Sequence, residues 1–498
     1  MQLVSRLIAS AAPLALAACA AVGSHVPTAQ IPPSAEATFV EAHTTAVSGA
    51  EARDDWWRLY NDPVLDGLVQ QALAANKDLA VAVANIDLAR ASLRSSRSQR
   101  LPQTSIGGGA QYGRPSGLDR APGQHSDWAL STGLDVAYEV DLFGRVRHDI
   151  EAARADVSAA EADRDAVRVT VAAETARAYA DILTSERQLT VARQTVDLLD
   201  QSVRLSKKRF DAGRTNKLDL VRISALRDQQ LAKIPDFQAD LDSASFRLAT
   251  LTGHTPADRP VTSGHGKLLE LAQAIPVGDG RTLLARRPDV RAAERRLAAS
   301  SARIGVATAD LYPRITIGGS LAASATSIAS LFTGGALGFL VGPLLNWSFP
   351  NQAAARAKIA GAEAQSRADL ARFDKTVLTA LQETETALSR YGNEIVRRQS
   401  LRSARDQAEQ AARITRAQLR EGRADSLAVL DAERTLAQAE ADLAEADARL
   451  ADDQVDLFRA LGGGWQTGVT TAKSGAGNTP SASAAILLPI NQGSTIRS

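Results

Sequence analysis

Hydrophobic and polar residues alternate along residues 128–142, and the alternation then stops. Even positions read Trp, Leu, Thr, Leu, Val, Tyr, Val and Leu, while odd positions are small or acidic. A period of two predicts a β-strand with one apolar face and one small, acidic face. The next stretch, 144–212, is long and polar and has no proline and no glycine after Gly144. It predicts a helix about 100 Å long.

The same succession of patterns occurs twice. The segments around Gly213 and Gly422 resemble each other, as do those around Gly253 and Gly462, and both pairs are 209 residues apart (422 − 213 and 462 − 253). We interpret this as a tandem repeat, each unit holding a helix, two strands, a very long helix and a returning helix. The first repeat spans 63–254, and its expected elements are strands at about 103–113 and 128–142, a long helix at 144–212 and a helix at 215–252. The second repeat spans 283–463, and its expected elements are strands at about 314–325 and 337–349, a long helix at 351–420 and a helix at 424–461.

The last helix carries a seven-residue repeat. Apolar residues recur at Val429, Leu436, Leu443, Leu450 and Leu457, with alanine three places further on at most steps. This spacing predicts left-handed coiled-coil packing with closely approaching helices. Pro235 has no counterpart, because position 444 (235 + 209) is alanine. We therefore expect a break or kink in the returning helix of the first repeat only.

The N-terminus reads as an export signal. Residues 1–18 contain one arginine and then an apolar run that is too short for a spanning helix, and Leu-Ala-Ala precedes Cys19, the only cysteine. An ordinary cleaved signal is one interpretation. A lipoprotein signal is the favoured one, with Cys19 carrying N-palmitoyl and S-diacylglycerol lipid and no other cofactor expected. Residues 19–62 then form a lipid tether and an N-terminal equatorial segment, 255–282 an equatorial linker, and 464–498 a flexible tail.

Composition argues against several other functions. Lys+Arg 57 against Asp+Glu 56 gives a net charge of +1, so no basic field for nucleic acid is expected. The six histidines are scattered, and no hydrolase, nucleotide-binding or zinc motif is present. One cysteine and one methionine exclude a metal site made of sulfur ligands. We expect no enzyme.

The strands raise the question of what covers their apolar faces. A soluble half-buried sheet is the common answer. Three features instead favour strands between lipid and a water-filled lumen. They are the export signal, the small opposite faces, and the aromatic residues on the apolar faces: Trp128, Tyr138, Trp347 and Phe349.

Four strands cannot close a barrel, so the chain must oligomerise. Three copies give twelve strands (4 × 3), which suits a pore better than the eight of a dimer. The acidic candidates for the barrel lumen are Asp135, Glu139 and Asp141.

Specific stretches carry a family resemblance. They are the tandem unit, "LAAC" ending at Cys19, "DDWWRLYNDPVLDGLVQQALAANKDL" from Asp54, "EVDLFGR" from Glu139 and "RRPDVRAAERRLAASSARIGVATADLYP" from Arg286. Together they resemble the outer-membrane factors of tripartite efflux systems, which are TolC-like proteins, and within them the NodT/OprM-like lipoproteins of RND efflux.

The resemblance implies a mixed α/β membrane protein: a homotrimeric channel-tunnel with a 12-stranded β-barrel, four strands per protomer, and a long periplasmic α-helical barrel. The implied location is the outer membrane. The implied partners are outer-membrane lipid, a periplasmic adaptor (membrane fusion) protein and an inner-membrane RND pump.

The resemblance also implies a constriction at the periplasmic helix tips. Its candidates are Asp219, Asp431, Asp425, Arg214 and Arg423. The competing interpretation is that Asp219 and Asp431 occupy the first turns of helices, where negative charge is favourable.

Two other functions stay open at this point. One is a lipid-anchored coiled-coil scaffold or adaptor without a pore. The other is a type I secretion exit channel for polypeptides.

Overall fold

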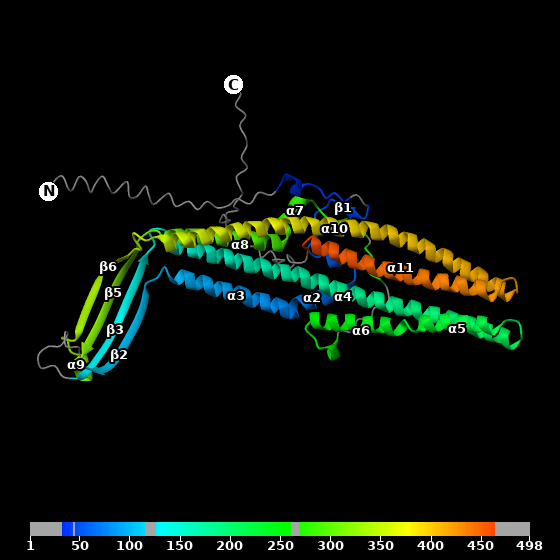
Figure 1. Ribbon diagram of the computed structural model, residues 1–498, viewed down its shortest axis with the longest axis horizontal. Helices are drawn as coiled ribbons and strands as arrows, with labels where there is room; N and C mark the ends of the chain where they lie inside the picture. The colour runs from blue at the N-terminus through cyan, green and yellow to red at the C-terminus, as the bar shows by residue number, and fades with distance from the viewer. Residues whose placement is uncertain (1–31, 43–44, 115–125, 260–267, 272, 464–498) are drawn as a thin grey trace, which may run out of the picture.

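The structure is a computed structural model that describes residues 32–42, 45–114, 126–259, 268–271 and 273–463. The signal, Cys19 and the tail at 464–498 lie outside the described residues. The molecule is elongated, with a four-stranded sheet at one end and long helices running away from it (Figure 1). This arrangement follows directly from the abrupt change of pattern near Gly144.

The sheet contains the four expected strands. They are β2 (Gln103–Gly113), β3 (Asp127–Val140), β5 (Arg314–Ala325) and β6 (Leu337–Asn346), antiparallel in the order β2-β3-β5-β6. Two strands end earlier than the sequence pattern predicted. The last residue of β6, Asn346, pairs with Arg314, which follows Pro313, so β5 offers no further partner. β3 ends at Val140 because Asp141 turns to cap the next helix.

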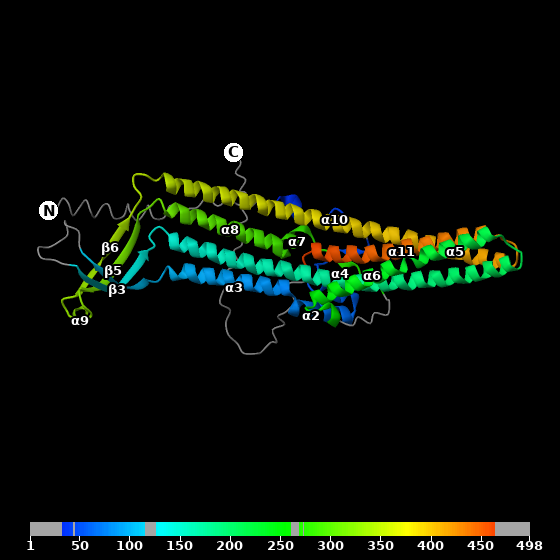
Figure 2. The same cartoon turned by 60° about the horizontal axis from the view of Figure 1, so that its bottom comes forward.

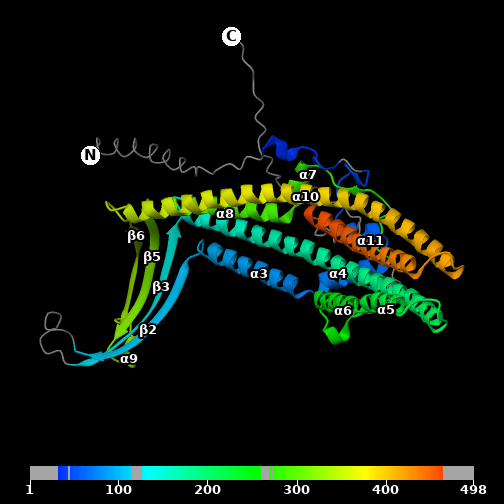
Figure 3. The same cartoon turned by 45° about the vertical axis from the view of Figure 1, so that its right-hand side comes forward.

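The strand register keeps the two faces apart. Leu134 lies between Ile106 and Leu321, whereas the next residue, Asp135, lies between Ser105 and Ser320. A slip of one residue would exchange these faces along the whole strand. The alternation seen in the sequence of one strand therefore extends across the neighbouring strands. Figure 3 shows the curvature of the sheet.

Two long helices connect the sheet to the far end of the molecule. They are α4 (Arg145–Asp211) and α10 (Ala353–Arg420), each just inside the range expected. In the half nearest the sheet, α3 (Lys77–Ser98), α4, α8 (Pro288–Ala309) and α10 lie side by side in one layer (Figure 2). Among the described residues, no helix combines the length and the apolarity needed to cross a bilayer.

The far half consists of two helical hairpins. In the first repeat α4 returns as α5 (Lys217–Leu231) and α6 (Ile234–Leu251), and in the second α10 returns as the single helix α11 (Ser426–Ala460). The predicted break near Pro235 is confirmed, since Pro235 occupies the first turn of α6. The coiled-coil seam of α11 is buried at Val429, Leu436 and Leu457 and half-buried at Leu443 and Leu450.

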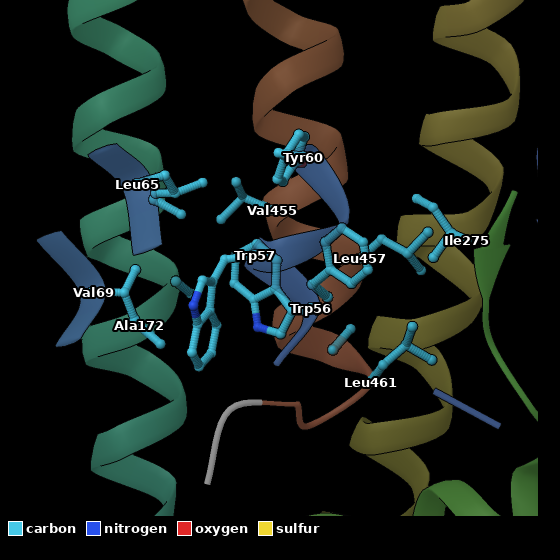
Figure 4. Close-up of a cluster of buried hydrophobic side chains, with 14 of the residues drawn as sticks. Trp56, Trp57, Tyr60, Leu65, Val69, Ala172, Ile275, Val455, Leu457 and Leu461 are labelled. Atoms are coloured by element: carbon cyan, nitrogen blue, oxygen red, sulfur yellow. The ribbon is translucent and has the colours of Figure 1, made fainter. Parts of the chain in front are cut away.

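The main core lies between the two halves. Trp56 is fully buried and stacks on Phe458 of α11 with ring centroids 4.6 Å apart, and Ile182 of α4 belongs to the same cluster. Figure 4 shows Trp56 with Val455 and Leu457 of α11. Around this core lie the short elements η1 (Pro33–Glu36), β1 (Val47–Ser48), η2 (Trp56–Tyr60), α2 (Pro63–Ala75), η3 (Pro256–Asp258), β4 (Ile275–Pro276) and α7 (Gly280–Arg286), while α9 (Ile328–Leu331) lies between β5 and β6.

Candidate functional site

Among the described residues, none covers the apolar face of the sheet. Ile106 is 83% exposed and Phe339 is 80% exposed, although both lie in the middle of strands. A contiguous apolar surface of this kind marks a contact with lipid or with another protein. The exposed apolar residues that share this face by register are Ile106, Tyr112, Trp128, Leu134, Tyr138, Ile317, Leu321, Leu337, Phe339, Val341 and Leu345.

Aromatic pairs lie near both ends of the sheet. At the end far from the helices, the rings of Tyr112 and Trp128 are 5.5 Å apart. Where the sheet meets the helices, Trp347 stacks on Phe349 with centroids 4.6 Å apart. From Trp128 to Tyr138 the strand rises about 33 Å. At the usual tilt of membrane strands this rise matches an apolar band about 25 Å tall bordered by aromatic girdles. These dimensions favour lipid as the cover.

The opposite face is small and polar. Asp135, one of the lumen candidates, is exposed there beside Ser105 and Ser320. Leu340 and Leu344 of β6 are exceptions, since their partners Ser320 and Thr316 place them on this face. A surface of glycine, serine and alanine with a few charges is typical of a water-filled passage.

The other two lumen candidates stabilise the junction between sheet and helices. The carboxylate of Glu139 accepts two hydrogen bonds from the Arg145 guanidinium, both at 2.8 Å. Asp141 lies beyond the end of β3 and accepts the backbone N–H groups of Val146 (3.0 Å) and Arg147 (2.8 Å). The interpretation of Asp141 as a strand residue was therefore wrong. Its position just before a long helix was the signal for a capping role.

A polar cavity of about 410 Å³ lies at this junction. In its wall the Lys358 ammonium is 3.0 Å from the Asp310 carboxylate, and Arg314 is 3.5 Å from the same side chain. Charged side chains of both signs therefore border the cavity. Among the described residues, no three His, Cys, Asp or Glu side chains are arranged to hold a metal ion.

The two helical tips share one turn geometry. Gly213 and Gly422 have φ angles of 68° and 75°, and the following arginine N–H bonds in each case to a carbonyl five residues back, at 2.8 Å. Left-handed backbone of this kind favours glycine, which explains why glycine marks both turns. Asn216 caps α5 and Asp425 caps α11. The duplicated sequence thus builds duplicated tips.

The constriction candidates are divided between these tips. Asp219 lies in the first turn of α5 and accepts the Thr215 hydroxyl at 2.6 Å. Asp425 accepts the Ala428 N–H at 2.8 Å, so helix capping accounts for its position. Asp431 is exposed and is the sixth residue of α11, which contradicts its interpretation as a first-turn residue.

The two arginine candidates are exposed at the turns. Arg214 follows Gly213, and Arg423 lies 3.4 Å from Glu421. Within the described part of one protomer, no hydrogen bond or ion pair joins the candidates of one tip to those of the other.

Other contacts hold the tips together, and sequence reasoning did not identify them. Arg209 at the end of α4 donates to the carbonyl of Leu419 at the end of α10, at 3.0 Å. Within the second hairpin, Arg416 donates to Glu433, whose side chain is only 3% exposed (2.9 Å). Glu433 directly follows a seam alanine, and charges at such flanking positions commonly pair across a coiled coil. The position of Glu433 next to the seam was the sequence signal from which this ion pair could have been predicted.

Comparison with known proteins agrees with this geometry. The sequence matches the family described as "Outer membrane efflux protein" over residues 68–254 and 280–463, one stretch for each repeat. It is 32% identical to outer membrane protein OprJ of Pseudomonas aeruginosa, covering 83% of this chain and 87% of OprJ. It is 28% identical to nodulation protein T of Rhizobium leguminosarum bv. trifolii, covering 82% and 88%. The solved outer-membrane channel OprN superposes with a TM-score of 0.83 at 35% identity, covering 89% of this chain and all of that one.

Proposed function

The chain belongs to the outer membrane efflux protein family, and we propose that it acts as the passive, trimeric exit duct of a tripartite efflux pump for small toxic compounds. Its TolC-like fold and its role as an outer-membrane efflux channel follow from the relatives and the matching structures. The finer proposal adds the trimer, the partners, the lipid anchor and the gate. The observation that carries it is the uncovered sheet with one apolar face and one small polar face.

Trimerisation is supported by the open edges of the sheet. β2 and β6 each pair on one side only within the protomer. Unpaired backbone groups in lipid cost several kcal/mol each, so β6 of one copy must pair with β2 of the next. Three copies close twelve strands (4 × 3), with the Ile106 and Phe339 face toward lipid and the Asp135 face toward water.

The helices offer matching edges. In the layer of four helices, α3 and α10 lie at opposite sides (Figure 2). α3 exposes Val81 and Leu88, which are seven residues apart, and α10 exposes Leu378. The same exposed strip of α10 holds Ala357, Ala364 and Ala371 at seven-residue spacing. Small residues on one helix and larger apolar residues on the other suit close packing between protomers.

The proposed lipid on Cys19 would anchor the same protein to the outer membrane. Mass spectrometry of the mature N-terminus should show a residue carrying N-palmitoyl and S-diacylglycerol groups. Replacing Cys19 by serine should remove the lipid and leave a protein that still needs detergent, because the sheet keeps its apolar face. A Cys19→Ser protein that is water-soluble and non-conducting would instead support the scaffold without a pore.

The tips are the proposed contact with a periplasmic adaptor, which in turn connects to an inner-membrane RND pump. Leu218 and Leu427 are 51% and 53% exposed and lie at the same distance from their turn glycines (213 + 5 and 422 + 5). A trimer therefore presents six similar tips, each with an exposed leucine and an arginine. Replacing both leucines by aspartate should abolish capture of the adaptor encoded with the pump, while Val396→Asp, at an exposed position of α10 away from the tips, should not.

The decisive experiment measures conductance in planar bilayers. Purified trimers should form ion-conducting channels, and absence of conductance from well-folded trimers would refute the duct. Replacing Asp219 and Asp431 together by alanine should raise single-channel conductance, because two proposed rings of three carboxylates are removed. Asp228→Ala, an exposed carboxylate of α5, is the matched control. Unchanged conductance and cation selectivity in the double variant would leave these aspartates with structural roles only.

A further inference from the structure

The two repeats already form, inside one chain, the kind of contact that the open edges of the protomer lack. In the sheet, β3 of the first repeat pairs with β5 of the second, and in the helical layer α4 lies against α8. The open edges carry β6 and α10 on one side and β2 and α3 on the other (Figure 2). β6 and α10 are the second-repeat counterparts of β3 and α4, and β2 and α3 are the first-repeat counterparts of β5 and α8. The contact between copies is therefore expected to reproduce the contact between repeats.

The registers of the two strand hairpins fix which residues correspond. Gln103 pairs with Ala137 in the first repeat, and Arg314 pairs with Asn346 in the second. Gln103 and Arg314 each follow a proline, so β2 and β5 correspond at a spacing of 211 (314 − 103). It follows that β3 and β6 correspond at a spacing of 209 (346 − 137), which is also the spacing of the turn glycines.

These spacings transfer the register between repeats to the interface between copies. Asp135 of β3 pairs with Ser320 of β5. Their counterparts are Leu344 of β6 (135 + 209) and Gly109 of β2 (320 − 211). The same transfer sets Val341 of β6 opposite Tyr112 of β2, and both of these residues belong to the apolar face. A register shifted by one residue would instead set apolar-face residues of one copy opposite polar-face residues of the next.

Side-chain size supports the same register independently. On the polar face, each pair between the two edge strands then combines one glycine with one larger residue: Leu340 with Gly113, Gly342 with Gln111, Leu344 with Gly109, and Asn346 with Gly107. A slip of two residues in either direction keeps the faces aligned but sets Gly342 opposite another glycine and a leucine opposite Gln111. The transferred register is therefore the one in which large and small side chains alternate across the interface.

The sheet uses the same combination within the protomer. Leu344 lies over Gly318 of β5 so closely that a Cβ on Gly318 would be 3.1 Å from Leu344 Cδ1. With Gly109 of the next copy on its other side, Leu344 lies between two glycines that leave room for it. The register thus accounts for Leu340 and Leu344, the two leucines that interrupt the polar face.

The helices follow the same correspondence. His148 of α4 lies against Gly305 of α8, where a Cβ on the glycine would be 2.7 Å from the imidazole ring. The counterparts are Ala357 of α10 (148 + 209) and Arg94 of α3 (305 − 211), and both are exposed in the protomer. The expected contact between copies again combines a small residue with a large one, although the small residue now lies on the other helix.

We propose that β6 of one copy pairs with β2 of the next in the register that sets Leu344 opposite Gly109. The proposal rests on the trimeric channel proposed above and adds which residues of the open edges meet. The strand contacts around the barrel wall then alternate between two kinds, one within each copy and one between neighbouring copies, and both follow the same register.

Engineered cysteine pairs test this register in the full-length protein. Leu344 and Gly109 lie on opposite edges of the sheet, at least three strand spacings or about 14 Å apart, so a disulfide between them joins two copies. Leu344→Cys with Gly109→Cys should therefore give covalent trimers on non-reducing gels. The matched controls pair Leu344→Cys with Gly107→Cys or with Gln111→Cys. They should cross-link at least about ten-fold more slowly, because Cα atoms two residues out of register are about 7–8 Å apart, at the limit of a disulfide.

A second pair and a separate count of copies keep the outcomes distinct. Gly342→Cys with Gln111→Cys tests the same register. An added Cβ meets nothing within 4 Å at Gly342 and only Ser131 Oγ, at 3.5 Å, at Gly109, so both sites accept the substitution. The single-cysteine variants control for Cys19, and light scattering of the purified protein in detergent counts the copies before oxidation.

Two results would contradict the proposal in different ways. Trimers in which neither matched pair cross-links, or in which a control pair cross-links faster, would overturn the register and leave the trimer intact. A wild-type protein that is monomeric in detergent and forms no cross-links in any variant would overturn the trimer, and the register with it.

Discussion

The two hairpins at the end of the tunnel differ in one helix. Their long helices are almost equal, with 67 residues in α4 and 68 in α10. Their returning helices are unlike, because the first hairpin has α5 and α6 separated at residues 232–233, whereas α11 is continuous for 35 residues. The two hairpins therefore have nearly equal long helices, and they differ in whether the returning helix is continuous.

Local chemistry explains the difference. Pro235 of the first hairpin corresponds to Ala444 of the second, and a helix cannot continue normally through proline. The ion pair of Arg416 and Glu433 is also confined to the second hairpin, because the equivalent residues are Lys207 and Ser224 (416 − 209 and 433 − 209). A cavity of about 370 Å³ lies at the break, lined in part by Phe237 and Ala441. The returning helix of the second hairpin is therefore continuous, whereas that of the first is divided in two.

The largest effect is expected from giving the second hairpin the break of the first. Ala444→Pro removes the hydrogen bond from residue 444 and forces the proline ring against the carbonyl of Glu440, which costs about 3 kcal/mol or more. The variant should show a lower midpoint of thermal unfolding and new protease cleavage in α11. Ser426→Pro, at the first position of the same helix, is the control and should be tolerated. Equal stability of the two variants would show that continuity of α11 does not matter.

The buried ion pair should contribute less, but clearly. Glu433→Ala leaves the Arg416 guanidinium without its partner in a partly buried site, and the expected cost is about 2–4 kcal/mol. Glu445→Ala breaks an exposed pair with Arg449 on the same helix and should cost under about 1 kcal/mol. Denaturant unfolding of both variants measures the contrast. If the two costs were similar, burial of Glu433 would not make its ion pair more stabilising than an exposed one.

Much of this comparison was predictable from sequence, because it depends on patterns local to the chain. The alternation of β3, the uninterrupted polarity of α4, the turn glycines and the proline break each follow from backbone rules that need no partner. Strand ends were less predictable. Asn346 ends β6 only because Pro313 ends its neighbour, and that information lies 33 residues away (346 − 313).

The charged contacts show where prediction stops. The sequence indicated that Asp219 and Asp431 lie near the tips, and it left open whether they line a constriction or occupy the first turns of helices. Asp431 lies beyond the first turn of its helix. The sequence did not reveal that Arg209 of α4 donates to the carbonyl of Leu419, or that Arg177 of α4 pairs with Asp456 of α11. Long side chains from distant segments meet only after the repeats pack. Seam positions are set by apolar periodicity, whereas ion pairs depend on which face of each helix the partner covers.

The smallest expected effect tests whether Pro235 alone causes the break. Pro235→Ala restores an N–H that can bond to the carbonyl of Leu231, yet the proline already occupies a tolerated first-turn position. The change in free energy of unfolding should therefore stay within about 1 kcal/mol. Hydrogen exchange at residues 231–236 distinguishes two causes. Slower exchange in the variant means that the proline interrupts an otherwise continuous helix. Unchanged exchange means that packing of α5 and α6 on α4 fixes the bend, and that Pro235 is only compatible with a bend that this packing already imposes.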